Sequence, residues 1–471
     1  MSYDVGRFVR APRREQYDLI IIGSGPAGQR AAVQACKLGK TVMMIEKKRL
    51  GGSCLHLGTI PSKALREAAL GAMVDGGSLL RSVFARTHRV IEDECQIIED
   101  ALVRNKVDVL SGTGSFLDAS HVQVENKLGK FKVRGDVVIV AVGARPRRPM
   151  DLHFDDEILF DSDSILKLDT QPRSLLVLGG GVIGCEYASI FARMGVRVTL
   201  VESRPSLLPA VDPELVAALV REFERAGIDV RLVTKFIDMK RTTSADGRPA
   251  ADVTFADANG PRHEQFDSVL YCLGRSGNCE DLNLLAVGLQ VNERGTFEVN
   301  KNYQTAVPHV YAVGDVIGAP ALAASSSEQG RLAALHAFSG KDAEFPDTFP
   351  TGIYTIPEIS TVGLQESELG ERKEEYVVAK AHYAKLARGK IMSDETGFLK
   401  LIVHTGTHRV VGAAVIGTSA TELIHIGQVA IAFGAKVEFF VENVFNYPTL
   451  AEAYKVAAHK AINVLKRNSK G

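Results

Sequence analysis

Apolar residues near the start of the chain follow a strand–turn–helix–strand order. The stretch YDLIIIGSGPAGQRAAVQACKLGKTVMMIEK opens with an unbroken apolar run over 19–22, which is typical of a strand buried on both faces. Glycines stand at the exit of this run, and a helical stretch and a second apolar run follow them. This order predicts a β-α-β unit with parallel strands.

The glycines of this unit have the spacing of a dinucleotide-binding turn. Gly23, Gly25 and Gly28 form G-x-G-x-x-G. The first glycine permits a tight turn, the second lets the backbone approach a pyrophosphate, and the third lets the helix pack closely on the strand. The phosphates then meet a helix N-terminus. Glu46 follows the first glycine by 23 positions (46 − 23), where an acid binds ribose hydroxyls.

The same pattern recurs in SLLVLGGGVIGCEYASIFARMGVRVTLVES. Its glycines are Gly179, Gly181 and Gly184, and Glu202 again follows the first by 23 positions (202 − 179). One glycine-rich turn can be purely structural. Two copies, each between a strand and a helix and each with an acid at the same offset, predict two bound dinucleotides.

Three further strands are expected. VVIVAVGARP (137–146) and DSVLYCLGRSG (267–277) both end in a turn that contains a glycine and an arginine, as the return strands of nucleotide-binding domains do. A strand over 311–313 leads into Gly314 and Asp315, with a helix expected from Leu322. An acid at a strand end can accept hydrogen bonds from a polyol, although Gly-Asp is also common turn chemistry.

Length and charge restrict the class of protein. At 471 residues the chain is too long for one hydrophobic core, so two to four domains are expected. The 56 basic residues balance the 56 acidic ones, so no overall field attracts nucleic acid or an anionic membrane. The apolar runs are too short to span a bilayer. The expected partners are therefore small dinucleotides, with neither nucleic acid nor a membrane.

The cysteines and the N-terminus carry no sorting or metal signal. Six cysteines are scattered without a Cys-x₂-Cys pair, which argues against a disulfide framework or a metal site and favours the cytoplasm. Arg7, Arg10, Arg13 and Arg14 precede no apolar segment, so we expect a disordered basic tail rather than a secretory signal. A short transit peptide is the alternative, against which Asp4 and Glu15 count.

These elements, in this order, resemble the two-dinucleotide flavoprotein family of glutathione reductase and dihydrolipoamide dehydrogenase, from about Tyr17 to the C-terminal helix. The resemblance implies an α/β fold with two Rossmann-like domains, for FAD and NAD(P), and a C-terminal α+β dimerisation domain. The implied FAD domain is discontinuous, 1–150 and 274–345. The NAD(P) domain is 151–273, and the dimerisation domain is 346–471.

The resemblance also implies roles for individual residues. Asp315 matches a ribityl-binding aspartate, and Lys63 and Glu186 match a lysine–glutamate pair beside the flavin ring, although a surface lysine is the simpler reading of Lys63 alone. An ammonium held there would stabilise electron density on the reduced ring. The cofactor-binding residues implied are Gly23, Gly25, Pro26, Ala27, Gly28, Glu46, Lys47, Gly52, Ser53, Cys54, Thr59, Lys63, Gly114, Ala141, Gly143, Gly179, Gly181, Ile183, Gly184, Glu202, Arg204, Gly274, Arg275, Gly314, Asp315, Ala321, Leu322 and Ala323.

The chain has only the first of the two cysteines that form a redox motif in this family. Dithiol members carry Cys-x₄-Cys at the flavin, but GGSCLHLGTIPSKAL has Thr59 five positions after Cys54. They also use a histidine before proline, on the partner chain, as a base. Here NYPTLAE has Tyr447 at that place and retains Glu452. A phenol with a reference pKa of about 10 is a poor base at neutral pH.

Both parts of the dithiol chemistry are therefore missing. Cys54 is interpreted as a small buried residue, with a peroxidatic or sulfenic-acid cysteine as the alternative. The predicted reaction passes hydride between NADPH and NAD⁺ through the flavin, by ping-pong kinetics, in a homodimer or a larger homo-oligomer. GTIPSKALR, DSDSIL, GVIGCEYASIF, PTGIYTIPEIS and FNYPTLAEAY are similar to family members with that activity. The residues expected at the reaction site are Lys63, Glu186, Cys54, Thr59, Tyr447 and Glu452.

The choice of nicotinamide dinucleotide remains open at this point. Glu202 favours the free 2′-hydroxyl of NAD(H) and would repel a 2′-phosphate. Arg204 could supply a countercharge if Glu202 rotated away, or it could simply be solvated. An NAD(P)H:acceptor oxidoreductase that reduces a quinone, a dye or oxygen is therefore the alternative. A non-catalytic flavoprotein, acting as a redox-sensing or assembly module, is a third possibility, against which the intact glycine motifs argue.

Overall fold

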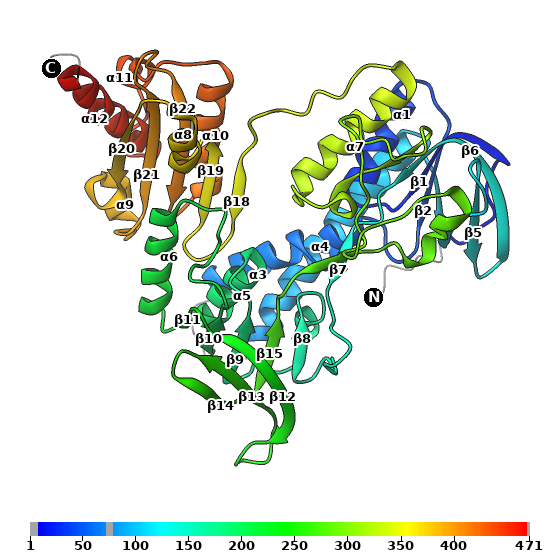
Figure 1. Cartoon of the computed structure of the whole chain (residues 1–471), viewed down its shortest axis with the longest axis horizontal. Helices are drawn as coiled ribbons and strands as arrows, with labels where there is room; N and C mark the ends of the chain where they lie inside the picture. Colours follow the sequence, from blue (N-terminus) through cyan, green and yellow to red (C-terminus); the bar gives the residue numbers. More distant parts are fainter. Residues whose placement is uncertain (1–7, 72–78, 469–471) are drawn as a thin grey trace. The chain divides into compact units, whose positions relative to one another are not determined.

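The computed structural model describes residues 8–71 and 79–468, and contacts divide the chain into two units (Figure 1). The first unit comprises residues 1–156, 160–170 and 273–345. The second comprises 157–159, 171–272 and 346–471. Each unit is described by itself below.

The first unit is built on a sheet with the order β3-β2-β1-β6-β5-β4, and β17 pairs with β6. Neighbours among β1, β2, β3, β6 and β17 run parallel, whereas β4 and β5 extend the sheet as antiparallel strands. The bounds are β1 Gln16–Ile22, β2 Val42–Glu46, β3 Asp108–Ser111, β4 Thr113–Phe116, β5 His121–Asn126, β6 Gly129–Val140 and β17 Val310–Ala312.

Helices cover one face of this sheet. Residues of α1, α4 and α7 share a buried apolar core with β1, β2 and β6. Gly330 lets α7 approach α1 closely, because a Cβ there would lie 2.0 Å from the carbonyl oxygen of Ala27. The remaining bounds are α1 Pro26–Lys37, α2 Gly52–His56, α3 Thr59–Gly71, α4 Leu79–Arg104, β7 Ala144–Pro146, β16 Arg275–Gly277, η5 Gly314–Ile317 and α7 Ala323–Ser339.

The second unit contains a parallel sheet and two antiparallel ones. Strands β11, β10, β9 and β15 lie side by side in that order and run parallel, and β12, β13 and β14 form an antiparallel sheet. The bounds are β9 Ser174–Leu178, α5 Val182–Arg193, β10 Arg197–Val201, α6 Pro213–Arg225, β11 Asp229–Arg231, β12 Lys235–Thr243, β13 Pro249–Asp257, β14 Gly260–Phe266 and β15 Ser268–Tyr271. Strand β8, Leu159–Asp161, spans a position at which the chain passes from one unit to the other.

An antiparallel sheet with the order β18-β19-β22-β21-β20 forms the C-terminal part of this unit. Buried residues of α10, α11 and α12 pack with it in one apolar core. The bounds are β18 Thr351–Ile353, β19 Ile359–Gly363, α8 Glu366–Arg372, β20 Tyr376–His382, α9 Ala387–Ile391, β21 Phe398–His404, β22 Val410–Ile416, α10 Ala420–Ala432, α11 Glu438–Glu442 and α12 Glu452–Asn468.

The predicted elements occur in the structure. Both strand–turn–helix–strand units are present, and the strand expected at 311–313 lies at 310–312. Leu322 is the N-cap of α7, one residue before its first helical position. The two return strands end at turns in which Gly143 and Gly274 have φ values of 67° and 102°, a region that favours glycine.

The expectation of a disordered N-terminal tail is wrong for the part that the structure describes. The guanidinium of Arg10 pairs with Asp108, and the backbone N–H of Arg13 donates to the same carboxylate at 3.1 Å. The hydroxyl of Tyr17 donates to Asp108 as well. Arg7 lies outside the described residues. The buried Asp108 thus fixes this arm, because a buried carboxylate needs several donors.

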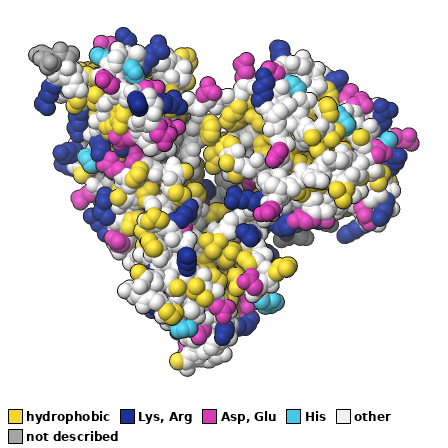
Figure 2. Space-filling view, in the orientation of Figure 1, with side chains coloured by type: hydrophobic (Ala, Val, Ile, Leu, Met, Phe, Trp, Pro, Cys, Tyr) yellow, Lys and Arg dark blue, Asp and Glu magenta, His cyan; other side chains and the backbone are white. Residues whose placement is uncertain are grey.

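Charged side chains of both signs alternate over the face in Figure 2, and no large area of one sign stands out. This agrees with the balance of acidic and basic residues in the sequence. Among the described residues, no helix has the length and hydropathy needed to cross a membrane.

Within the second unit, a buried lysine connects α6 to the C-terminal sheet. Lys400 on β21 is 2% exposed, and its ammonium lies 2.6 Å from Asp212 and 3.3 Å from Glu214, and also pairs with Glu366. Asp212 also caps α6 by accepting the backbone N–H of Glu214 at 2.9 Å. Burial alone would lower the pKa of Lys400, but these carboxylates raise it above its ordinary value.

We expect Lys400→Met to lower the melting temperature measured by calorimetry. Removing one partner of a buried ion pair leaves Asp212 uncompensated, which costs about 3–5 kcal/mol. The control is Arg173→Gln, because Arg173 makes its ion pairs with Asp246 and Asp267 at the surface, where such pairs stabilise little. Equal melting of both variants and the parent protein would contradict this role of Lys400.

Candidate functional site

The turn between β1 and α1 has the geometry that its glycines predict. Gly23 has a φ of 110°, and a Cβ at Gly28 would lie 2.1 Å from the carbonyl oxygen of Gly23. Gly25 is the N-cap of α1, and no atom of the described residues lies within 4 Å of the position of a Cβ there. The turn therefore leaves no room for a side chain at Gly23 or Gly28, but it has open space at Gly25, beside the helix N-terminus.

The turn between β9 and α5 repeats this geometry. Gly179 also has a φ of 110°, and a Cβ at Gly184 would lie 1.9 Å from its carbonyl oxygen. Gly181 is the N-cap of α5 and again has open space around its Cβ position within the described residues. Free backbone N–H groups at a helix N-terminus, reached through such a gap, suit a pyrophosphate.

A buried acid stands beside each turn. In the first, Glu46 accepts hydrogen bonds from the N–H and hydroxyl of Ser24, at 3.0 and 2.6 Å, and from the N–H of Lys48 at 2.8 Å. In the second, Glu202 accepts the N–H of Gly180 at 2.8 Å and that of Arg204 at 2.9 Å. Each acid therefore holds the glycine turn of its own domain in place through backbone hydrogen bonds. The spacing between the acid and the first glycine did not by itself predict this role.

The two acids differ in one contact. The guanidinium of Arg204 makes two hydrogen bonds to Glu202, from Nε at 3.0 Å and from Nη2 at 2.7 Å. Burial raises the pKa of Glu202, but the bonds from Arg204 and Gly180 outweigh it and lower the pKa to about 2. Glu202 is thus ionised at neutral pH.

Four predicted site residues come together around α2 and α3. Thr59 and Lys63 lower the pKa of the Cys54 thiol and Asp315 raises it, so these three side chains lie near the thiol. Burial is the largest influence, and it raises the pKa of Cys54. Cys54 is therefore a protonated thiol at neutral pH. The side chain five positions further, that of Thr59, carries a hydroxyl instead of a second thiol.

We expect Cys54 to react slowly with iodoacetamide at neutral pH. Only the thiolate is a strong nucleophile, and a raised pKa keeps its fraction small until the pH passes the ordinary thiol range near about 8.5. Mass spectrometry of the Cys54 peptide at several pH values, with N-acetylcysteine alkylated in parallel, measures this. A rate at neutral pH that equals or exceeds the rate of the free thiol would contradict the assignment.

Glu186 is oriented by a segment that sequence reasoning did not connect with it. This buried carboxylate on α5 accepts the backbone N–H of Tyr354 at 2.9 Å. Ser189, one turn further, donates to the Glu186 carbonyl oxygen at 2.8 Å and accepts the N–H of Ile356 at 3.1 Å. Lys63 belongs to the other unit, so its pairing with Glu186 stays a prediction.

The residues at the expected base position lie at the surface of the second unit. Tyr447 is 74% exposed, and Glu452, the first residue of α12, accepts the N–H of Thr449 at 3.5 Å. The exposed apolar residues of α10, α11 and the segment that follows them are Val429, Phe433, Phe439 and Val444. Exposed apolar residues of this kind mark a surface that a partner can bury.

Other predicted cofactor residues serve the framework of the first unit. The ammonium of Lys47 lies 2.5 Å from Asp281, and Arg275 donates to the carbonyl oxygen of Ala144 at 2.5 Å. Gly314 donates its N–H to Gln329 at 2.8 Å, which joins the end of β17 to α7. Most of the remaining predicted residues lie at or just before the starts of α1, α2, α5 and α7: Pro26, Ala27, Gly52, Ser53, Ile183, Ala321 and Ala323. Gly114 lies within β4, and Ala141 directly follows β6.

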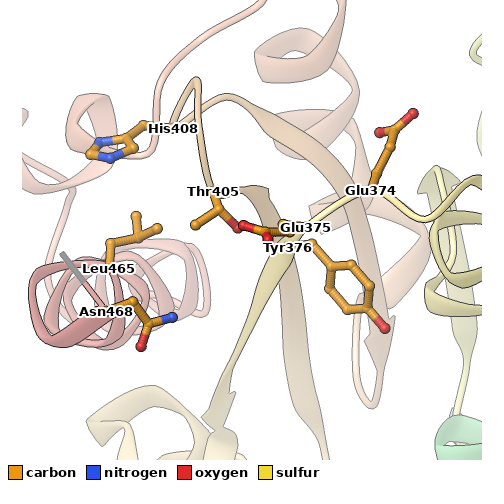
Figure 3. A pocket seen from close by; sticks show the side chains of 7 residues that line it. All are labelled: Glu374, Glu375, Tyr376, Thr405, His408, Leu465 and Asn468. Atoms are coloured by element: carbon orange, nitrogen blue, oxygen red, sulfur yellow. The ribbon is translucent and has the colours of Figure 1, made fainter. Parts of the chain in front are cut away.

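A surface hollow of about 580 Å³ lies elsewhere, in the C-terminal part of the second unit (Figure 3). Its lining consists of Glu374, Glu375, Tyr376, Thr405, His408, Leu465 and Asn468. None of these is a predicted cofactor residue, so the hollow is distinct from both glycine turns. Within the described residues, His, Cys, Asp and Glu form no group of three that could hold a metal ion, and no disulfide joins any of the six cysteines.

Two glycine turns with the same geometry, each beside a buried acid, define a protein with two dinucleotide sites. The chain belongs to the pyridine nucleotide-disulphide oxidoreductase family, whose model matches residues 17–330, and the dimerisation-domain model of the same family matches 349–458. It is an oxidoreductase of that family, which implies binding of a flavin and of NAD(P).

Several relatives match over nearly the whole chain. A soluble pyridine nucleotide transhydrogenase of Mycobacterium bovis is 44% identical over 96% of this chain and 98% of its own. One from Pseudomonas fluorescens is 40% identical over 95% and 99%. Among solved structures, LpdA from Mycobacterium tuberculosis has a TM-score of 0.85 at 26% identity, covering 95% of this chain and 99% of its own. The Cu(II) complex of the HOCl-induced flavoprotein disulfide reductase RclA from Escherichia coli has the same TM-score and identity over 95% and 100%.

Proposed function

We propose that this chain is an FAD-dependent transhydrogenase that moves hydride between NADPH and NAD⁺ by ping-pong kinetics, without a redox disulfide. The observation that carries the proposal is Thr59 near the Cys54 thiol, because a hydroxyl stands where a dithiol enzyme needs its second sulfur. The full-length similarity to proteins named soluble pyridine nucleotide transhydrogenase supports the same activity.

The proposal assigns the two dinucleotides to the two turns. FAD binds at Gly23, Gly25 and Gly28, in a domain made of 1–150 and 274–345. NAD(H) and NADP(H) bind at Gly179, Gly181 and Gly184, in a domain of residues 151–273. The open Cβ positions of Gly25 and Gly181, each at a helix N-terminus, fit a pyrophosphate.

When bound, FAD supplies the group that accepts and returns the hydride. The residues of the chain then hold and polarise the reactants. In the proposed arrangement, the ammonium of Lys63 lies beside the flavin ring and stabilises negative charge there, while Glu186 keeps that ammonium in place. The Tyr354 N–H fixes the orientation of the Glu186 carboxylate. With one nicotinamide site, the first product leaves before the second dinucleotide enters, which gives ping-pong kinetics.

The electrons and atoms balance without a base on the protein. NADPH gives up one hydride, and NAD⁺ receives one, so no proton has to be delivered by Tyr447. This fits a phenol at that position, because the reaction needs no proton acceptor there. Tyr447 and Glu452 act in the proposal by shaping the site of the partner chain rather than by transferring a proton.

The proposal includes a homodimer in the cytoplasm, with the dimerisation domain at 346–471. Phe433, which is 85% exposed, and the neighbouring apolar residues supply a surface for a second copy. Cysteines without disulfide bonds are typical of a reducing compartment. Size-exclusion chromatography with light scattering measures the assembly directly.

An anaerobic assay with NADPH and an NAD⁺ analogue of distinct absorbance tests the activity. The proposal expects rapid reduction of the analogue, with parallel lines in double-reciprocal plots, and no turnover of lipoamide or glutathione disulfide. The second candidate function is an NAD(P)H:acceptor oxidoreductase, and Glu202 favours it because this acid, held by backbone hydrogen bonds, would repel the 2′-phosphate of NADP(H). It predicts consumption of quinone or oxygen without reduction of the analogue. Absence of any flavin reduction would overturn both readings and leave a non-catalytic flavoprotein.

A further inference from the structure

A loop in the C-terminal part of the second unit is hydrogen-bonded to α5 at two points. Residues 354–358 join β18 to β19, which pair as an antiparallel hairpin. The backbone N–H of Tyr354 donates to the Glu186 carboxylate at 2.9 Å, and the N–H of Ile356 donates to the Ser189 hydroxyl at 3.1 Å. All of these residues belong to the same unit. Two backbone donors of the loop therefore meet two side chains that lie one turn apart on the helix.

The Ser189 hydroxyl is suited to hold the loop in one place. Ser189 is 4% exposed, and its hydroxyl donates to the carbonyl oxygen of Glu186 at 2.8 Å. A hydroxyl has one proton and two lone pairs, so this bond uses its proton within the helix and leaves a lone pair for the N–H of Ile356. Without the hydroxyl, that N–H would face a buried position that offers no acceptor, which is unfavourable.

The other end of the loop is fixed to α10. The buried Glu358 carboxylate accepts the backbone N–H and the hydroxyl of Thr421, at 3.0 and 2.8 Å. Within the loop, the Thr355 hydroxyl donates to the Pro357 carbonyl oxygen at 2.5 Å. Because one end is fixed and the loop is braced internally, the position of its remaining part depends on its two bonds to α5.

We propose that Ser189 is a positioning residue for hydride transfer, because its hydroxyl holds the loop where the Tyr354 N–H can orient the Glu186 carboxylate. This deepens the proposed function and rests on the role given there to Glu186 beside the flavin. The two donating N–H groups are two residues apart (356 − 354), so a shift of the first moves the second. A carboxylate that loses a fixed donor then holds the Lys63 ammonium less precisely, and catalysis depends on such precision.

We expect Ser189→Ala to slow hydride transfer without weakening the binding of NADPH. The limiting rate of flavin reduction should fall about 3- to 10-fold, which is the effect expected from one neutral hydrogen bond. The dissociation constant of NADPH should stay the same, since Ser189 lies outside the glycine turn. Anaerobic stopped-flow measurements of the FAD-loaded enzyme at several NADPH concentrations give both quantities.

Ser360→Ala is the matched control. Ser360 is 1% exposed, and its hydroxyl donates to the Thr351 carbonyl oxygen at 2.8 Å, inside the same hairpin. This variant also loses one buried hydroxyl, but its hydrogen bond does not reach α5. Its melting temperature should fall while its limiting rate stays at the parental value. Equal losses of rate in Ser189→Ala and Ser360→Ala would overturn the inference, because a general loosening of the hairpin would explain both.

A double variant tests whether Ser189 acts through Glu186. Glu186→Ala should slow flavin reduction more than Ser189→Ala does. Adding Ser189→Ala to it should change the rate by less than about 2-fold, because two residues that act through one group do not contribute independently. Independent effects of the two substitutions would overturn the inference.

The single variants separate this inference from the proposed function. A parental rate in Ser189→Ala beside a slow Glu186→Ala enzyme would overturn the positioning role alone and leave the proposed function standing. A parental rate in Glu186→Ala would reject the role of Glu186 beside the flavin, and the inference about Ser189 with it.

Discussion

A Gly184→Ala variant is expected to retain its flavin and to lose reduction by both NADH and NADPH by about two orders of magnitude, since strain of roughly 3 kcal/mol at the turn corresponds to that change. The added Cβ would lie 1.9 Å from the carbonyl oxygen of Gly179, so the turn between β9 and α5 must shift. The flavin turn belongs to the other unit and should be unaffected. Stopped-flow measurement of flavin absorbance with each dinucleotide gives the rates.

Two further glycine variants separate the causes. The methyl group of a Gly181→Ala variant meets no atom of the described residues within 4 Å, so this variant should have the melting temperature of the parent protein. Its affinity for dinucleotides should nevertheless be lower, because the methyl group occupies the space through which the pyrophosphate approaches. Gly28→Ala, with its Cβ 2.1 Å from the Gly23 carbonyl oxygen, should be purified with little flavin. A Gly184→Ala enzyme reduced at the normal rate would contradict the assignment of the second turn.

A Thr59→Cys variant is expected to acquire the redox disulfide that the parent chain lacks. Thr59 lies near enough to Cys54 to affect the pKa of its thiol, so we expect a sulfur at 59 to reach Cys54 and to form a bond with it on oxidation. Thiol titration of the unfolded variant should then find five free thiols, from six in the parent plus one minus the two in the bond. Anaerobic titration should consume four electrons for each flavin in place of two.

The new dithiol should divert electrons but should not by itself reduce external disulfides. The exposed Tyr447 still stands at the position of the base, so turnover of a disulfide should require Tyr447→His as well. Thr59→Ser is the matched control, because it keeps the hydroxyl and adds no sulfur. A parent enzyme that already takes up four electrons for each flavin would contradict the account of Thr59.

Local features of the site could be predicted because their signals lie close together in the sequence. The glycine spacing set the φ values and the close approaches of Gly23, Gly28, Gly179 and Gly184, and an acid 23 positions later lies at the end of the next parallel strand. Leu322 marked the start of α7 for a similar reason, since turn and helix propensities are local.

The contacts that were missed depend on partners far away or on the backbone. Glu186 is oriented by the N–H of Tyr354, and a backbone donor leaves no trace in residue type. Lys400 reads as an ordinary strand lysine until the fold brings Asp212 and Glu366 to it. The arm at Arg10 is ordered because Asp108 is buried beside it, which a charge count cannot reveal. Tertiary contacts decide these cases, and local pattern does not.

The most direct test of the central claim is a two-step transfer under anaerobic conditions. Enzyme is reduced with one equivalent of NADPH, freed of nicotinamide by gel filtration, and mixed with one equivalent of an NAD⁺ analogue. The account predicts that the flavin absorbance returns and that one equivalent of reduced analogue appears, with no dependence on added thiols or disulfides. A flavin that stays reduced until a quinone, oxygen or a disulfide is added would contradict it.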